Sequence, residues 1–555
     1  MRAKRTNSGL TVHAVAGTHV VLLGLDLSPA RRKGCLGFAI QRRDHIEGET
    51  YWLRGMKTFE ATDPGLGPGG TASSRAHPFQ TFQWADYSAK PGHDYTYTVV
   101  PLGGKPEALT EGAPVSLRVQ TEAEAGARHS VWFNRGSLAS QEYARRFLNK
   151  SPDEIPGGAA YTWLSRGLVE ALLAFIARAD GPRYRLVGAI YEFQWPAVLH
   201  AIRLAAQTGA SVRIVYDAIT DGNGPAEKNL AAVRDAEIKG LTKGRTEGKL
   251  MHNKFLILVK DGNPLAVWTG STNVTENGLF GHSNLGQVVE DPAVARAYLA
   301  YWQALEDDPT TPEMKDWTGT DNAAPPDPWV EDQTVVFSPR RGTAVLDWYA
   351  EIARGARKAL LMTFAFGMHK NFTQVYQRDD RVLRFALMEK EGNGPGLAEG
   401  RRQIDRLRRR PNVVVAIGNN ITLNSFDRWL KERSKLSNEV NVRFVHTKYM
   451  LVDPLGPHPV VVTGSANFSR ASTDTNDENM IVIRDDPRVA DIYLGEFMRL
   501  FSHYAFREAV KIAQASGEDP EVWRPNYLAP TDAWQKDYFR DGSARFLRRR
   551  YFAGK

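Results

Sequence analysis

The chain has a single cysteine, Cys35, among its 555 residues. One thiol excludes an intramolecular disulfide and any metal site built from several cysteines. Such low cysteine content is typical of proteins from a reducing compartment, so we expect a cytoplasmic protein. The sequence also lacks a cluster of Asp, Glu and His residues with the spacing of metal ligands, so we expect neither a bound metal nor another cofactor.

Long apolar runs are absent as well. No stretch of about 18 apolar residues occurs, so no transmembrane helix is predicted. The N-terminus begins with basic residues, but His13, His19 and Asp26 interrupt the apolar residues that follow. This pattern favours strands rather than a signal peptide, although it leaves export by another route open.

Basic residues modestly outnumber acidic ones. The chain has 71 Lys and Arg residues against 63 Asp and Glu residues, which gives a net charge of +8. A positive balance favours an anionic partner, either nucleic acid or a membrane surface. Two basic clusters occur, RRQIDRLRRR at 401–410 and ARFLRRRYF at 544–552. Each cluster alone is equally typical of a solvated helix face.

The length predicts several domains. In the first 122 residues, short strands between Gly- and Pro-rich turns predict a β-sandwich. Tyr95, Tyr97 and Val99 alternate in GHDYTYTVVPL, as in a half-buried antiparallel strand. This segment resembles a strand of a fibronectin type III domain.

From residue 128 the pattern changes to strands that alternate with helices. LVGAIY at 186–191 and SVRIVYD at 211–217 predict buried strands, and an amphipathic helix is predicted between them. Such alternation predicts a parallel or mixed α/β sheet. The same succession returns after a Pro- and Asp-rich connector at 316–333. We therefore predict two α/β domains, at 128–310 and 330–510, and a basic C-terminal extension at 511–555.

The strongest signal is a duplicated motif. HNKFLIL at 252–258 precedes TGSTNVT at 269–275, and HTKYMLVD at 446–453 precedes TGSANFS at 463–469. In both copies the Lys, Gly, Ser and Asn stand 2, 18, 19 and 21 residues after the His. Residues i and i+2 of a strand face the same side, so each His and Lys project together. Burying two such groups unpaired costs several kcal/mol, so the pair is predicted to face a ligand.

The duplicated pattern resembles the H-x-K-x4-D and G-S-x-N signature of the phospholipase D superfamily, over roughly 128–510. The resemblance implies two homologous half-domains with mixed sheets around a pseudo-twofold axis. It also implies one shared site and a metal-independent phosphodiesterase reaction through a covalent phosphohistidine. The catalytic residues that it implies are His252, Lys254, Asn273, His446, Lys448 and Asn467, and the substrate-binding residues are Gly270, Ser271, Gly464 and Ser465.

The two halves differ in their acidic residues. Glu478 stands where many family members have an acid that hydrogen-bonds a catalytic histidine, and this acid can reach across to the opposite half. Alignment on the Asp-Pro dipeptide at 291–292 places Ser283 at the equivalent position. A carboxylate raises the basicity of its imidazole. We therefore expect Glu478 to support His252 as the nucleophile, with His446 as the acid/base.

The final Asp of the motif also differs. Asp453 stands seven residues after His446, whereas Val259 stands seven residues after His252 and the nearest acid is Asp261. Because this Asp tends to be structural in the family, its displacement is interpreted as a local insertion that leaves activity intact.

The substrate is less determined than the reaction. The basic balance and the arginine clusters favour a nuclease that acts on nucleic acid. A phospholipase D or phosphatidyl transferase that acts on membrane phospholipid is the alternative. For that alternative, 165–179 is a candidate membrane-binding helix, although it reads better as a core helix. A non-catalytic binding protein is disfavoured by two intact His-Lys-Asn sets. YEFQW at 191–195 and His282 are weaker candidates for lining the substrate channel.

Overall fold

The computed structural model describes residues 1–67, 70–136, 140–148, 150–220, 224–323, 332–365, 367–392, 396–418, 445–515 and 527–555. Residues 324–331 of the predicted connector and 516–526 of the predicted extension lie outside the described residues.

The N-terminal region contains two larger antiparallel sheets and a two-stranded sheet of β6 (Arg54–Gly55) and β7 (Ala72–Ser73). The first has the strand order β1-β2-β3-β8, with bounds Arg2–Asn7, Leu10–Ala16, Val21–Leu27 and Gln83–Asp86. The second has the order β10-β9-β4-β5, with bounds Ala108–Glu111, Asp94–Lys105, Gly37–Asp44 and Thr50–Trp52, and β11 (Val115–Gln120) also pairs with β9. Tyr95, Tyr97 and Val99 of β9 lie in the core that both sheets share, as their alternation predicted. The fibronectin type III resemblance stays a prediction.

The first α/β half has a seven-stranded sheet with the order β12-β18-β17-β16-β13-β14-β15. Its strands are β12 (His129–Phe133), β13 (Tyr184–Ile190), β14 (Ser211–Asp217), β15 (Thr242–Arg245), β16 (Lys254–Lys260), β17 (Asn263–Gly270) and β18 (Leu285–Val289). Its helices are α2 (Ser140–Phe147), α3 (Ala159–Ser165), α4 (Leu168–Ala177), α5 (Pro196–Gln207), α6 (Ala226–Asp235), α7 (Pro292–Glu306) and α8 (Thr311–Thr320).

The second half repeats this sheet strand for strand, in the order β19-β25-β24-β23-β20-β21-β22. The strands are β19 (Gln333–Ser338), β20 (Ala359–Phe364), β21 (Leu383–Met388), β22 (Val413–Ile417), β23 (Tyr449–Val452), β24 (Val460–Gly464) and β25 (Glu478–Arg484). The helices are α9 (Ala344–Arg354), α10 (Lys370–Tyr376), α11 (Leu397–Arg408), α13 (Arg470–Asp474) and α14 (Pro487–Ala515). In each half three strands run parallel and the remaining pairings are antiparallel, which confirms the predicted mixed sheets.

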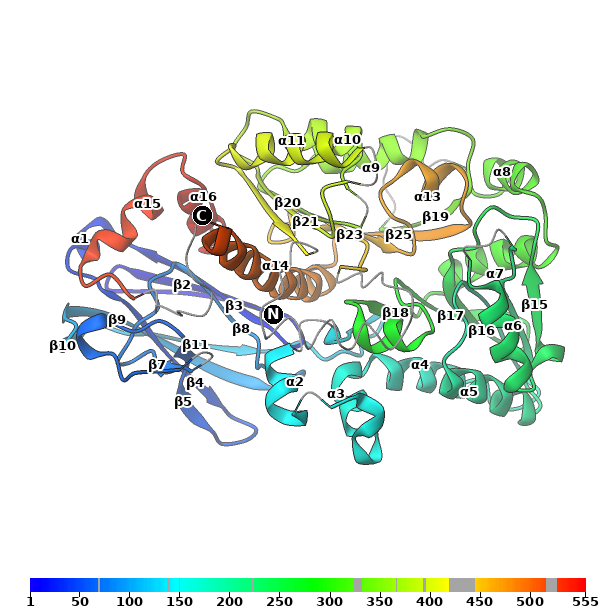
Figure 1. Cartoon of the computed structure of the whole chain (residues 1–555), viewed down its shortest axis with the longest axis horizontal. Coiled ribbons are helices and arrows are strands. Elements are labelled where there is room, and N and C mark those ends of the chain that lie inside the picture. The colour runs from blue at the N-terminus through cyan, green and yellow to red at the C-terminus, as the bar shows by residue number, and fades with distance from the viewer. Residues whose placement is uncertain are drawn as a thin grey trace.

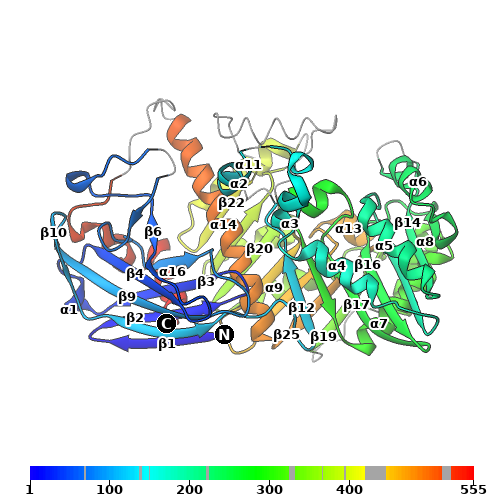
Figure 2. The ribbon, with the colours of Figure 1, turned by 90° about the horizontal axis from the view of Figure 1, so that it is seen from below.

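Both faces of each sheet are buried, which explains the nearly continuous apolar strands. Phe255 and Ile257 of β16 face a core that the two halves share, whereas Leu256 and Leu258 face a second core beneath α4 and α5. The shared core also contains Trp302 of α7 and side chains of α14. The long helix α14 runs between the N-terminal sheets and the second half (Figures 1 and 2). The two motif-bearing strands, β16 and β23, therefore flank one interior.

The C-terminal residues pack against the N-terminal sheets. Helix α16 (Ala544–Phe552) packs against β3, and α15 (Lys536–Phe539) packs against α16. Trp534 stacks on Phe82 with ring centroids 5.3 Å apart, and the carbonyl of Phe552 lies 2.8 Å from Nδ1 of His13. Residues 527–555 of the predicted extension therefore pack against the N-terminal sheets, and the domain boundaries stay predictions.

Among the described residues, no single helix is both long and apolar enough to cross a membrane. The segments 156–165 and 168–177 pass that test only as a pair, with a bend of 96° between them. Leu168, Leu172 and Phe175 of α4 are buried in the core of the first half. The segment 165–179 is thus a core helix, as its sequence favoured.

Candidate active site

The two motif histidines lie just before equivalent strands, His252 before β16 and His446 before β23. The residue before each histidine forms a β-bridge to the opposite half. Met251 pairs with Asp477, and Val445 pairs with Ser283. Both bridges are parallel, so each loop that carries a histidine is held against the opposite half.

His252 contacts the predicted acid of the other half. Its Nδ1 lies 2.9 Å from Oε2 of Glu478, and both side chains are buried. Glu478 of the second half therefore contacts His252 of the first half, as expected. An imidazole that donates from Nδ1 to a carboxylate keeps its lone pair on Nε2, the atom that a nucleophile needs.

His446 has an amide where His252 has a carboxylate. Its Nδ1 lies 2.8 Å from Oδ1 of Asn284, a residue of the first half. The hydroxyl of Ser271 donates to this amide oxygen at 2.8 Å, just as the hydroxyl of Ser465 donates to Glu478 at 2.7 Å. The two histidines thus have equivalent partners of different charge.

This arrangement corrects the equivalence of Ser283 with Glu478. Gly270 pairs with Gly286 in the first sheet, and Gly464 pairs with Met480 in the second, so Glu478 corresponds to Asn284. The first half has one residue fewer between this point and its Asp-Pro dipeptide. Alignment on that dipeptide therefore shifted the comparison by one residue.

The motif lysines lie beside the histidines. Nζ of Lys254 donates to the carbonyl of His252 at 2.6 Å, and Nζ of Lys448 donates to that of His446 at 2.6 Å. Both lysines are buried, with 3% and 2% of their surface exposed. Two buried ammonium groups give the site a positive charge that an anion would neutralise.

The electrostatics join the two sets into one site. Burial lowers the pKa of His252 to about 4, against the opposing effect of Glu478, and Lys448 of the other half lowers it further. Burial likewise lowers the pKa of His446 well below its usual value, and the lowering contributions include Lys254 and His252. Both imidazoles are therefore neutral at pH 7. Burial opposes ionisation of Glu478, but His252 and Lys254 hold its pKa below the usual value.

The motif asparagines are placed alike. Nδ2 of Asn273 donates to Oε2 of Glu192 at 2.6 Å. The Oδ1 atoms of Asn273 and Asn467 are buried without a hydrogen-bond partner among the described residues. Buried polar atoms are normally paired. Two equivalent unpaired atoms, one in each half, are consistent with a polar ligand at this point.

The motif glycines allow strands to approach closely. Gly270 has a φ of 150° and Gly464 a φ of 155°. A Cβ atom would lie 2.3 Å from the carbonyl of Leu285 in the first case and 2.2 Å from that of Asn479 in the second. The close approach sets the following serines against Asn284 and Glu478. Direct contact of Gly270, Ser271, Gly464 and Ser465 with substrate stays a prediction.

Asp261 stands two residues further from its motif histidine than Asp453 does, because the strands before it are longer. Asp453 and Asp261 both have positive φ, and the backbone N–H of each donates to the start of the central strand, at Ala359 and Arg183 respectively. The segment from Arg183 to the end of β13 is two residues longer than the segment from Ala359 to the end of β20. Two residues are therefore added on both paired strands, and the strand ends that carry the site stay in register.

The two acids have unequal structural roles. The carboxylate of Asp453 accepts hydrogen bonds from the backbone N–H groups of 357, 358 and 359, at 2.8, 2.7 and 2.8 Å. Asp261 pairs instead with the exposed Arg183. We expect Asp453→Ala to lower the free energy of unfolding by about 2 kcal/mol, because three backbone donors lose their acceptor. Urea unfolding measures this change.

Asp261→Ala is the matched control, because its backbone has the same left-handed conformation. It should cost less than about 1 kcal/mol, since exposed ion pairs contribute little. Both variants should keep phosphodiesterase activity. An equal loss of stability in the two variants would contradict the unequal roles.

Two further rings lie beside the histidines. The ring of Tyr191 lies 5.0 Å from that of His252, and the ring of His282 lies 5.8 Å from that of His446. Of the aromatic segment 191–195, Tyr191 is half-buried at the site, whereas Phe193 belongs to the core. Sequence reasoning missed Asn284, and it named Glu192 only as part of the candidate segment 191–195. The only signal for Asn284 was its position next to Ser283.

The first basic cluster is largely paired with acids. In and near α11, Arg402 and Arg406 pair with Glu399, Arg401 with Glu391, Arg408 with Glu508 and Arg410 with Asp379. In the second cluster, Arg549 pairs with Asp26. These pairs reduce the charge that the first cluster offers to a nucleic-acid backbone. In the second cluster, Arg545, Arg548 and Arg550 form no ion pair with an acid among the described residues.

Within the part of the chain that the structure describes, one group of residues has the spacing of a metal site. Asp44, Glu47 and His93 have ligand atoms within 4.8 Å of one another. They belong to the N-terminal sheets, and Asp44 already accepts from the backbone of a turn and lies 2.9 Å from His93. The group contains none of the motif residues.

Comparison with known proteins points to one family. A family model described as "Cardiolipin synthase, PLD-like domain" matches residues 172–305 and 406–501. The sequence has no significant match among curated proteins. Among solved structures, polyphosphate kinase from Porphyromonas gingivalis is 14% identical with a TM-score of 0.36, over 64% of this chain and 51% of that one. The chain thus spans about half the length of that kinase.

Two other solved structures are similar over more of their own length. Phosphatidylserine synthase from Haemophilus influenzae is 11% identical with a TM-score of 0.44, over 64% of this chain and 93% of that one. The phospholipase D family member Nuc from Salmonella typhimurium is 19% identical with a TM-score of 0.23, over 31% of this chain and 94% of that one. Each segment of the family match carries one His-Lys-Asn set, and the fold brings the two sets together. The matched residues 172–305 and 406–501 therefore form a domain of the phospholipase D superfamily.

Proposed function

We propose that the protein is a metal-independent phosphodiesterase that works through a covalent phosphohistidine. One observation carries this proposal. His252 and His446 come from different halves, yet His252 contributes to the lowered pKa of His446, and Lys448 of the second half contributes to the lowered pKa of His252. Both histidines, Lys254 and Lys448 are buried. Positive charge in a largely buried site stabilises the charge that develops on a phosphoryl group in the transition state.

The proposed reaction has two steps. Nε2 of His252 attacks phosphorus, the bond to the leaving oxygen breaks, and His446 gives that oxygen its proton. His446 then takes a proton from water, which attacks phosphorus and releases His252. His446 must be protonated for the first step, although burial lowers its pKa well below the usual value. The negative charge of a bound phosphodiester raises this pKa, so substrate supplies the missing stabilisation.

We propose nucleic acid as the substrate. The ion pairs of the first arginine cluster weaken the argument from basic clusters. The support comes from the neighbourhood of the site. Asn134 donates to the carbonyl of His282 at 2.7 Å, so the next residue, Arg135, lies close to the catalytic segment. The guanidinium of Arg135 lies 4.7 Å from the ring of the half-buried Trp163. Arginine binds phosphates, and aromatic rings stack on bases.

Arg135 forms no ion pair with an acid among the described residues, whereas Arg166 and Arg499 both pair with Glu496. Burial and the charges of Arg166 and Arg499 lower the pKa of Arg135 to about 9, against the opposing effect of Glu496. Arg135 remains charged at pH 7, and a nearby anion would stabilise this charge. A nucleic-acid backbone supplies such an anion on either side of the scissile bond.

A membrane phospholipid is the second candidate substrate. The description of the matching family model names cardiolipin synthase, which favours a phosphatidyl transferase reaction. In that reaction an alcohol instead of water would attack the phosphohistidine, with the same residues in the same roles. A cytoplasmic location stays a prediction from the cysteine content.

The test is a substrate panel in the presence of EDTA. Plasmid, single-stranded DNA, RNA and vesicles of phosphatidylglycerol or phosphatidylcholine are incubated with the pure protein. We expect nucleic acid to be cut and its cutting to survive the chelator. Release of phosphatidic acid or formation of cardiolipin, with nucleic acid intact, would favour the phospholipid reaction. Loss of all activity in EDTA, restored by added metal, would contradict the metal-independent reaction.

A further inference from the structure

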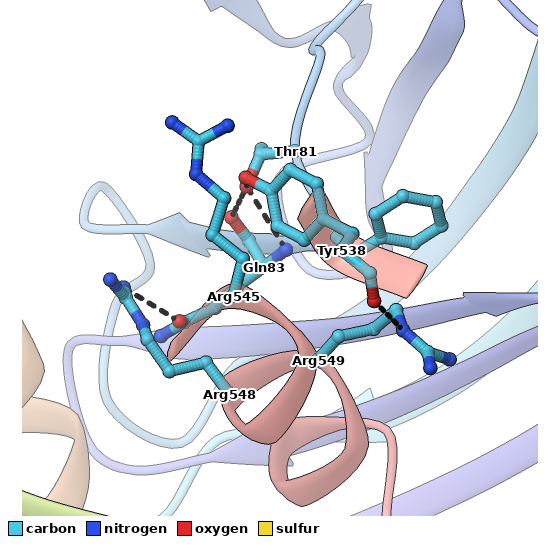
Figure 3. A pocket seen from close by; sticks show the side chains of 7 residues that line it. Thr81, Gln83, Tyr538, Arg545, Arg548 and Arg549 are labelled. Carbon is cyan, nitrogen blue, oxygen red and sulfur yellow. Dashed lines mark hydrogen bonds between the residues drawn. The ribbon is translucent and has the colours of Figure 1, made fainter. Parts of the chain in front are cut away.

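A second positively charged site lies away from the motif residues. A cavity of about 160 Å³ opens between the loop before β8 and the C-terminal helices. We call it the arginine pocket, and its lining consists of Thr81, Phe82, Gln83, Tyr538, Arg545, Arg548 and Arg549 (Figure 3). Thr81 to Gln83 come from the N-terminal sheets, and the other residues come from α15 and α16.

Hydrogen bonds hold the polar groups of the pocket in place. Arg548 donates from Nη2 to Oε1 of Gln83 at 3.1 Å, and the hydroxyl of Tyr538 donates to that of Thr81 at 3.3 Å. The guanidinium of Arg545 lies 5.3 Å from the ring centroid of Tyr538. In Figure 3 Arg545 and Arg548 extend from the same side of α16. The pocket therefore combines two guanidinium groups with two hydroxyls.

The positive charge of the pocket lacks an acidic partner. In the described ranges no Asp or Glu forms an ion pair with Arg545 or Arg548, whereas their neighbour Arg549 pairs with Asp26. Burial lowers the pKa of Arg548, and the charge of Arg545 lowers it further. Burial and Arg545 also lower the pKa of Lys57. Three cations thus repel one another around the pocket.

The pocket lies where three parts of the chain meet. Besides the N-terminal sheets and α16, the guanidinium of Arg548 lies 5.7 Å from the ring of Phe385, a residue of β21 in the second half. A bound anion would therefore neutralise charge at a junction between the N-terminal sheets and the second catalytic half. Ligands that bind only the folded state stabilise it.

We propose that the arginine pocket binds a phosphate dianion, either free phosphate or a terminal phosphomonoester. Guanidinium groups bind phosphate oxygens through parallel N–H donors. The remaining N–H groups of Arg545 and Arg548 supply these donors, because the hydroxyl of Tyr538 already donates to Thr81 and the hydroxyl of Thr81 donates to the carbonyl of Gln83. The site uses none of the motif residues, so it is separate from the site proposed for catalysis.

The test measures binding of inorganic phosphate to the full chain by isothermal titration calorimetry, at constant ionic strength set with chloride. Arg545→Gln and Arg548→Gln should each raise the Kd of the pocket by about tenfold or more, because each removes a charge-assisted hydrogen bond. Arg550→Gln is the matched control. Arg550 is exposed on the same helix and does not line the pocket, and its substitution removes the same charge.

A second measurement separates the arginine pocket from the catalytic site, which also attracts phosphate. Hydrolysis of bis(p-nitrophenyl) phosphate should stay within about twofold of the wild type in all three variants, because none of the exchanged residues belongs to the motif. A variant that loses phosphate binding but keeps hydrolysis therefore shows that the lost binding took place in the arginine pocket. Arg545 is exposed, so Arg545→Gln gives a folded variant even if Arg548→Gln does not fold.

The source of the phosphate is distinguished with two short oligonucleotides, one with a 5′-phosphate and one with a 5′-hydroxyl. Tighter binding of the phosphorylated form in the wild type, but not in Arg545→Gln, identifies a terminal phosphomonoester. Equal binding of the two oligonucleotides together with binding of inorganic phosphate identifies free phosphate. Unchanged phosphate affinity in both pocket variants, an equal loss in Arg550→Gln, or no phosphate binding to the wild type would each overturn the proposal.

Discussion

His252→Ala is expected to lower phosphodiester cleavage by about four orders of magnitude or more, because it removes the proposed nucleophile and no covalent intermediate can form. His446→Ala should have a similar effect on substrates with poor leaving groups, since their leaving oxygen needs a proton. Steady-state cleavage of the substrate found in the panel measures both losses. His458→Ala is the control, because His458 is exposed and pairs only with Asp485.

The roles of the two histidines are separated with a substrate whose leaving group needs no proton. With bis(p-nitrophenyl) phosphate, His446→Ala should complete the first step and then stop, because water is no longer activated. One p-nitrophenolate leaves in this step, so intact-protein mass spectrometry should detect an acid-labile p-nitrophenyl phosphoryl group on His252. Phosphorylation of His446 in the His252→Ala variant would reverse the assignment.

The duplicated architecture was predictable from local patterns. Equal spacing of His, Lys, Gly, Ser and Asn in two copies predicted two homologous halves, and the structure has two sheets of identical strand order. The reason is physical. Strands buried on both faces have continuous apolar sequences, and a glycine is required where a Cβ would meet a neighbouring carbonyl, as at Gly270 and Gly464. These constraints are local, so they are visible in the sequence.

Features that depend on distant contacts were not predictable in the same way. Asn284 was missed because alignment of the two halves on their Asp-Pro dipeptides equates Glu478 with Ser283, one residue before the equivalence that the sheet pairing gives. Only the sheet pairing decides which side chain contacts His446. The basic clusters were interpreted without their partners. Arg408 pairs with Glu508, one hundred residues away, and Arg549 pairs with Asp26 at the other end of the chain. Sequence spacing carries no signal for such pairs.

The asymmetry between Glu478 and Asn284 leads to the second large effect. Glu478→Gln should lower kcat by about a hundredfold, because the partner that orients and supports the nucleophilic imidazole loses its charge while keeping its shape. Glu478 acts to raise the pKa of His252, which is about 4. Removing this carboxylate lowers that pKa further. His252 attacks only when neutral, so the acidic limb of kcat/KM should move to lower pH.

Asn284→Asp is the reciprocal change at the equivalent position. It places a carboxylate against His446, whose pKa lies well below the usual value, and thereby raises that pKa. His446 must be protonated to act as the acid, so the alkaline limb of kcat/KM should move to higher pH, with a smaller change in kcat than in Glu478→Gln. Full pH profiles of the two variants measure both limbs. If both substitutions moved the same limb, the two histidines would not have the distinct roles that their unlike partners indicate.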